Sequence, residues 1–175
     1  MKKLEELILF ILDRAKKKGI EDLSLFQLFK ISYLIQVLSF KYAGKSFLED
    51  VVFIRHKNGP ISISIYDAIE HLENEGYIKV KKSKKEDYEY ERHGHELVKK
   101  IPKLSFKKGE RIFLDSFLSE LLPLSQRKLK EYAYSTEPMK EITQQERKGV
   151  KKGAVLNFTS VTVDPDVVDA YAGKG

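Results

Sequence analysis

Four histidines are the side chains best suited to metal binding or proton transfer in this sequence. His93 and His95 flank Gly94, so this segment offers two ligands at most, whereas a zinc site needs three or four that converge. The chain has no cysteine, which excludes disulfides, thiolate metal sites and cysteine nucleophiles. No serine lies in a nucleophile-elbow motif, and Gly44-Lys45-Ser46 lacks the earlier glycine of a phosphate-binding loop. We therefore predict no enzyme activity, no metal and no cofactor.

Lysines are the second group that could do chemistry, because they can contact phosphates or an acidic protein surface. The net charge is +6, and 26 of the 32 basic residues are Lys while only 6 are Arg. Arginine is the side chain that binds guanine or phosphate with two hydrogen bonds, so this split disfavours sequence-specific DNA recognition. The candidate contacts to a partner or to nucleic acid are Lys79, Lys81, Lys82, Lys84, Lys85, Lys99, Lys100 and Lys103.

The length of 175 residues favours one compact domain with an appendage. We place the domain at residues 1–146, and a basic hinge with a C-terminal strand or tail at 147–175. The longest apolar run, from Leu7 to Leu12, is far shorter than the roughly 20 residues that cross a bilayer. The sequence thus predicts a cytoplasmic protein that does not contact a membrane.

Apolar periodicity predicts several helices around one central helix. The central helix spans residues 24–43, begins at the N-cap Ser24, ends at Gly44 and is apolar almost all round, which is typical of a core helix. The other predicted helices cover residues 3–17, 61–75, 108–122 and 126–135. Leu129, Tyr132 and Ala133 face inward in the last of them, and the inward stripe of the helix at 61–75 consists of Ile65, Ala68, Ile69 and Leu72.

Two stretches predict extended structure. A β-branched run at 51–56 leads through a tight turn to the helix at 61–75, with Pro60 at its first position and Ser64 and Asp67 forming a capping box; Gly76 closes this helix. Residues 77–82 and 88–92 form a charged β-hairpin, followed by a helical turn around Leu97. The predicted fold class is α+β, mainly α: a compact helical domain with a small antiparallel β-hairpin.

The segment from Gly59 to Val98 has the order of a winged helix: a recognition helix, a wing and a following helix. DNA binding through the lysines of the wing is therefore the alternative function. Against it, the stretch from Ile61 to Gly76 carries four carboxylates and neither Lys nor Arg, so this helix would bring negative charge to a polyanion.

The C-terminal tail leaves three arrangements open. Its apolar alternation from Val155 to Val163 is consistent with a strand. That strand could pair with the sheet edge of a partner, pack on its own domain, or pack on a second copy in a homodimer.

Several landmarks taken in order resemble the Panacea domain, the SocA-like domain of antitoxins. They are Lys30 and Tyr33 in the central helix, Gly44 after it, Gly59-Pro60 at the end of an extended segment, and Gly76 after the next helix. Residues 124–134 resemble the last helix of the family. Pro138 matches the proline of the element that follows, although the His and Trp of that element are absent.

The resemblance implies a mostly helical domain without catalysis or a cofactor, which neutralises a cognate toxin by direct binding. A variable surface or an appended segment would select the toxin. The candidates in this chain are the hairpin at 77–92 and the tail after Gly149.

Overall fold

The computed structural model describes residues 1–83, 92–149 and 153–167. The helices are α1 (Lys3–Lys17), α2 (Leu25–Ala43), α3 (Ile63–Asn74), α4 (Lys108–Leu121), α5 (Gln126–Ser135), α6 (Glu137–Arg147) and the short 3-10 helix η1 (Phe158–Ser160). The strands are β1 (Asp22–Ser24), β2 (Ile54–His56), β3 (Gly59–Ile61), β4 (Ile78–Ser83) and β5 (Arg92–Leu97). The predicted class, α+β and mainly α, is confirmed.

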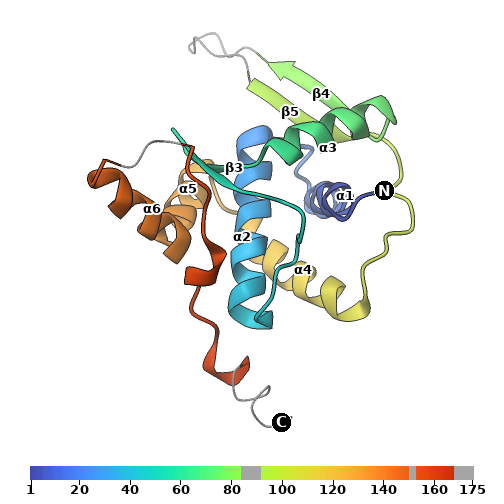
Figure 1. Ribbon diagram of the computed structural model, residues 1–175. Coiled ribbons are helices and arrows are strands. Elements are labelled where there is room, and N and C mark those ends of the chain that lie inside the picture. The colour runs from blue at the N-terminus through green and yellow to red at the C-terminus, as the bar shows by residue number, and fades with distance from the viewer. Residues whose placement is uncertain (84–91, 150–152, 168–175) are drawn as a thin grey trace.

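Helix α2 lies at the centre of the molecule, with other helices around it (Figure 1). Ser24 caps it as predicted: its side chain accepts a hydrogen bond from the Gln27 N–H at 3.1 Å. Gly44 ends it in the left-handed conformation with φ 66°. Residues from 28 to 39 are buried on every face, which a helix covered from several sides requires.

Two small antiparallel sheets flank α2. The first has the strand order β1-β5-β4, and the second pairs β2 with β3. The order α3, β4 and β5 matches the recognition helix and the wing of the predicted winged-helix segment. The described part of the second hairpin strand, β5, continues to Leu97, because Leu97 and its neighbours pair with β4 where a helical turn was expected. That prediction was wrong, and residues 84–91 lie outside the described residues.

Three details of the predicted helices were wrong. Pro60 lies in β3 instead of the first helical position. Helix α3 begins after the N-cap Ser62, so Ser64 lies inside the helix and cannot form the expected capping box with Asp67. Tyr132 is 39% exposed instead of inward, while Leu129 and Ala133 are buried as predicted. Residues 137–147 form α6, a helix that the sequence pattern did not reveal.

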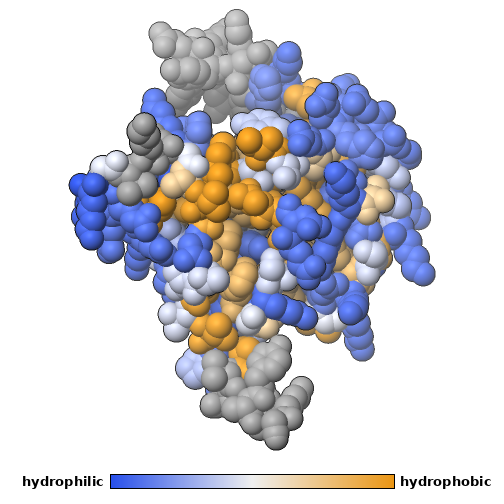
Figure 2. Space-filling model, in the orientation of Figure 1, coloured by the Kyte–Doolittle hydropathy of each residue, from blue (hydrophilic) through white to orange (hydrophobic). Residues whose placement is uncertain are grey.

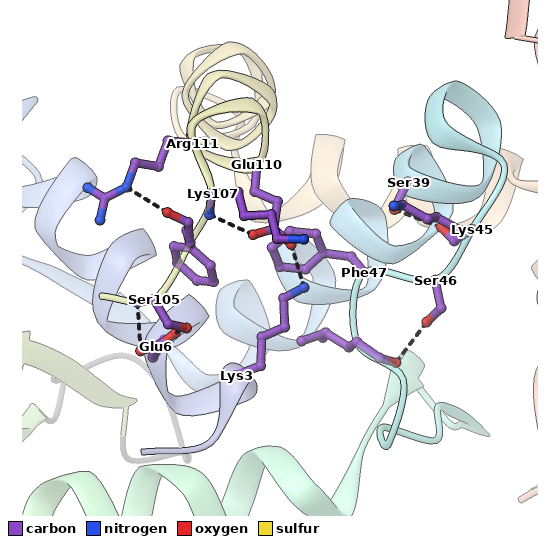
Figure 3. A network of polar contacts seen from close by, with 12 residues as sticks. Lys3, Glu6, Ser39, Lys45, Ser46, Phe47, Ser105, Lys107, Glu110 and Arg111 are labelled. Carbon is purple, nitrogen blue, oxygen red and sulfur yellow. Dashed lines mark hydrogen bonds and ion pairs between the residues drawn. The ribbon is translucent and has the colours of Figure 1, made fainter. Parts of the chain in front are cut away.

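The basic segment from Lys99 to Arg111 is tied to the helices by polar contacts (Figure 3). Ser105 donates hydrogen bonds from its N–H and its hydroxyl to the Glu6 carboxylate, at 2.9 and 2.5 Å. Glu110 accepts from the Lys107 N–H at 2.9 Å and pairs with Lys3 at 2.6 Å. Glu110 thereby satisfies an N-terminal donor of α4, so part of this segment has a structural role.

Candidate protein-binding surface

Lys30, Tyr33, Pro60 and Pro138 of the motif lie where α2, β3 and α6 come together, whereas Gly44 and Gly76 follow the ends of α2 and α3. Lys30 and Tyr33 lie on α2, and the Lys30 ammonium is 3.4 Å from the carbonyl oxygen of Pro60 in β3. Tyr33 shares a hydrogen bond of 2.7 Å with the hydroxyl of Thr136, which is the N-cap of α6. Pro138 lies in the first turn of that helix, where proline is tolerated because its N–H would have no partner. The motif therefore joins three elements that are distant in sequence.

Lys30 has an unusual environment for a charged side chain. It is only 1% exposed, its Nζ lies 4.0 Å from the centre of the Phe26 ring, and its one described hydrogen bond is the long one to Pro60. Burial lowers its pKa to about 7, and the positive charges of Lys130 and Arg55 add to the effect.

Arg55 lies beside this junction and was not singled out from the sequence. It is 8% exposed, and its Nε forms an ion pair of 2.9 Å with Glu146 of α6. Its guanidinium also lies 5.2 Å from the centre of the Tyr134 ring. The signal in the sequence that could have pointed to Arg55 is its position inside a β-branched run. Its partner could not be found, because Glu146 belongs to the helix that sequence periodicity missed.

The described part of the tail, residues 153–167, packs on its own domain. Ile54 forms an antiparallel bridge with Val155. Three backbone hydrogen bonds support it: from Arg55 N–H to Ala154 C=O, from Gly153 N–H to Arg55 C=O, and from Leu156 N–H to Phe53 C=O, at 2.9, 2.8 and 2.9 Å. Beyond this bridge the expected strand is replaced by η1, whose Phe158 contacts Tyr33 and Phe53. Residues 153–156 thus form a third segment beside β2 and β3, and we call these three segments the ribbon.

Alternation gives the ribbon two different faces, since successive residues of a strand point to opposite sides. Phe53, Arg55, Pro60 and Leu156 are buried against the core. The opposite side carries Ile54, whose partners across the ribbon are Ile61 on one side and Val155 on the other.

The outer face of the ribbon is an exposed apolar surface. Val155 is 63% exposed, Val52 55% and Ile63, the first residue of α3, 65%. Ile54, Ile61 and Val155 are paired across the ribbon, and Val52 and Ile63 lie two residues from Ile54 and Ile61 along the chain. We call these five β-branched residues the apolar row. Figure 2 shows a hydrophobic area at the centre of this view, where Figure 1 places β3 and the nearby C-terminal segment. Such contiguous apolar surface on a charged protein is typical of a binding site for another protein.

The family model for the antitoxin SocA-like Panacea domain matches residues 28–139. The chain belongs to this family. All seven motif positions, from Lys30 to Pro138, fall inside the matched range of the Panacea domain. Every residue of the apolar row except Val155 also falls inside it. No curated protein and no solved structure matches the chain.

The outward face of α3 in this Panacea domain is acidic. Asp67, Glu70 and Glu73 are exposed, whereas the predicted inward stripe of Ile65, Ala68, Ile69 and Leu72 is buried. Tyr66 is 47% exposed and packs edge-on against Phe29 at 5.1 Å between ring centroids. A helix with this face repels phosphates and suits a polypeptide partner.

The candidate lysines of the hairpin do not form one row. Lys79 and Lys81 lie on one side of β4, and Lys82 lies on the other by strand alternation. Lys81 pairs with Glu96 at 2.8 Å, and this hydrogen bond raises the pKa of Lys81. Lys84 and Lys85 lie outside the described residues.

The second group of candidate lysines follows β5. Lys99, Lys100 and Lys103 are exposed, and the Lys99 ammonium lies 4.5 Å from the centre of the Tyr77 ring. The structure therefore does not bring the two lysine groups together into one described site, and their contact with a partner or with DNA stays a prediction.

The histidines contribute no described metal centre. His95 is 4% exposed and its Nδ1 is 3.0 Å from the carbonyl oxygen of Leu23; burial lowers its pKa. Across residues 1–83, 92–149 and 153–167, no group of three or more acidic or histidine side chains could hold a metal ion. Within the same ranges, no helix has the length and apolar character needed to span a membrane.

Proposed function

We propose that this Panacea-domain protein is the antitoxin of a toxin–antitoxin pair, and that it neutralises its toxin in the cytoplasm by direct binding. Membership of the family supports the antitoxin role. The observation that supports direct binding is the apolar row, with three large aliphatic side chains more than half exposed. Burying such a surface against another protein is favourable because it removes apolar area from water.

The mechanism we propose is occlusion. A toxin that packs on the apolar row would have part of its own surface covered, and no chemical step on the antitoxin is needed. The alternative of a DNA-binding winged helix is less well supported. The helix that would enter the major groove exposes Asp67, Glu70 and Glu73, and Lys81 is paired with Glu96.

The proposal is tested by expressing each reading frame beside this gene, alone and together with this protein. We expect one neighbour to arrest growth when alone, and co-expression to restore growth through a complex that purifies as one species. If neither neighbour is toxic, or if growth is restored without a complex forming, direct neutralisation is wrong.

Substituting Ile63→Asp should weaken toxin binding strongly. A charge placed in the apolar row must be desolvated when the toxin packs on it, so we expect Kd to rise by at least about 30-fold, as for a central interface residue. The measurement is titration calorimetry of the purified pair, with growth rescue as the cellular readout.

Ile112→Asp is the matched control, because Ile112 is 61% exposed on α4 against 65% for Ile63. The control variant should bind the toxin like the wild type, and both variants should melt close to it. Equal binding by the two variants would contradict a role for the apolar row. If Ile63→Asp instead converted a dimer to a monomer and left rescue intact, the row would be a self-association surface.

A further inference from the structure

A half-open cleft of about 970 Å³ lies beside the apolar row. Its walls are the first turn of α1, the loop 48–51 and one side of α3. Leu4, Leu48 and Ala68 are among its lining residues and are at most 6% exposed, so they give the cleft an apolar floor.

The rim of the cleft is rich in carboxylates. Glu49, Asp50 and Asp67 line it and are exposed, and none of the three has an ion pair with another described residue. A fourth carboxylate, that of Glu5, is already occupied: it accepts from the Lys2 N–H at 2.9 Å and lies 3.2 Å from Nδ1 of His71.

The cations that line the cleft offset this rim only in part. The Met1 amino group, Lys2 and Lys3 line it, but Lys3 pairs with Glu110 at 2.6 Å and lies over the Phe47 ring, both outside the cleft lining. The three carboxylates of the rim therefore outnumber the two remaining cations. The net charge of the whole chain is +6, so this rim is a locally acidic area on a basic protein. A basic group of a partner would be attracted here and repelled over much of the remaining surface.

The cleft and the apolar row draw on neighbouring residues of the chain at two places. Val51 lines the cleft, and Val52 belongs to the row; Ser64 lines the cleft, and Ile63 belongs to the row. One polypeptide segment could therefore cover both.

We propose that the cleft receives a lysine or arginine side chain from the same toxin segment that packs on the apolar row; this inference rests on the proposed function. The aliphatic stem of such a side chain packs on the floor of Leu48 and Ala68, and its cationic head reaches Asp67 and the carboxylates of the loop. Long basic side chains bury their stems in this way while the head stays hydrated. The partner is thus a segment with apolar residues and a nearby basic one.

The first test is charge reversal. In the double variant Asp50→Lys/Asp67→Lys, affinity for the neutralised toxin should fall at least about tenfold, because a basic side chain now meets like charge. The matched control is Glu120→Lys/Glu131→Lys, which changes the net charge equally on exposed residues of α4 and α5 and should alter affinity less than about threefold. Replacing the toxin's basic residue with glutamate should restore binding to the first variant only. Wild-type affinity in the Asp50→Lys/Asp67→Lys variant overturns the inference and leaves the proposed function standing.

A second test does not depend on the toxin. N-acetyl-arginine methylamide, titrated into the full-length protein at millimolar concentration, should shift the amide resonances of Val51, Ser64 and Ala68. Its uncharged citrulline analogue should not, and the shifts should vanish in Asp50→Lys/Asp67→Lys. No shift at these amides, or equal shifts with both compounds, overturns the inference even where growth rescue succeeds; specific shifts support it even where no toxic neighbour exists.

Discussion

Substituting Gly59→Val should destabilise the protein by about 3 to 5 kcal/mol, because strain and crowding act together at this position. Gly59 has φ +112°, a backbone conformation that L side chains rarely adopt. A Cβ atom there would lie 2.9 Å from Cε and 3.1 Å from Nζ of Lys30, and 3.3 Å from the Tyr134 ring. Lys30 is buried between α2 and β3 and has little room to move. The measurement is the free energy of unfolding in urea.

Gly76→Val is the control that separates the two causes. Gly76 has φ +73°, but a Cβ there meets nothing within 4 Å, so only the backbone strain applies and we expect a loss of about 1 to 2 kcal/mol. We expect Gly59→Val to impair folding first and toxin binding only as a consequence. A wild-type melting temperature for Gly59→Val, or equal losses in the two variants, would show that close packing on Lys30 is not what requires glycine.

Lys30 should make stability rise with pH across the neutral to alkaline range. Its pKa is about 7 in the folded protein, against the ordinary 10.5 of an unfolded chain. Between these values the unfolded state binds more protons than the folded state, so the free energy of unfolding increases as the pH rises. Below about pH 7 the ammonium is charged in both states, and the full penalty for burying it applies. The difference is at most about 5 kcal/mol.

The Lys30→Met variant should lose this dependence, since methionine fills a similar volume without a charge. We expect it to be more stable than the wild type at pH 6, and this advantage should shrink toward pH 10. Lys130→Met is the control: Lys130 is exposed, and its removal should leave most of the pH dependence in place. Arg55, Lys130 and Tyr134 lie near Lys30 and are ionisable themselves. Because they can also contribute to the pH dependence, the stability of each variant is compared with that of the wild type at every pH. Parallel curves for Lys30→Met and the wild type would contradict a buried, titrating Lys30.

Strong local signals made most of the fold predictable. Helix α2 is the clearest case, because its apolar residues on every face, its N-cap Ser24 and its C-terminal Gly44 are all local features of the sequence. The structure confirmed all three. The inward stripe of α3 was confirmed for the same reason. Helix α6 was missed because it buries only Pro138, Met139 and Ile142, too few for a clear period, and its packing on α5 and η1 supplies what the local pattern lacks.

The apolar row could not be predicted, because no single stretch contains it. Val52 and Ile54 come from one segment, Ile61 and Ile63 from a second and Val155 from a third, nearly a hundred residues later. In the sequence these residues look like ordinary strand interiors. The pairing of Ile54 with both Ile61 and Val155 shows that these three residues share one outward face, and no local pattern in the sequence indicates that pairing. The negative charge of α3 could be predicted, because the stretch contains four carboxylates and no basic residue. This charge already favoured a protein partner over DNA.

The pairing of residues 153–156 with β2 affects how partner choice in such proteins can be mapped by deletion. A chain shortened to residue 147 would lose Val155 from the outside and Leu156 and Phe158 from the inside. It would also expose the backbone edge of β2, which is prone to pair with other chains. Lost neutralisation in such a deletion would therefore not identify the tail as a separate recognition module. Chimaeras that exchange residues 52–63 and 153–161 together would keep the paired segments matched. Such chimaeras are expected to transfer the choice of partner without disrupting the ribbon.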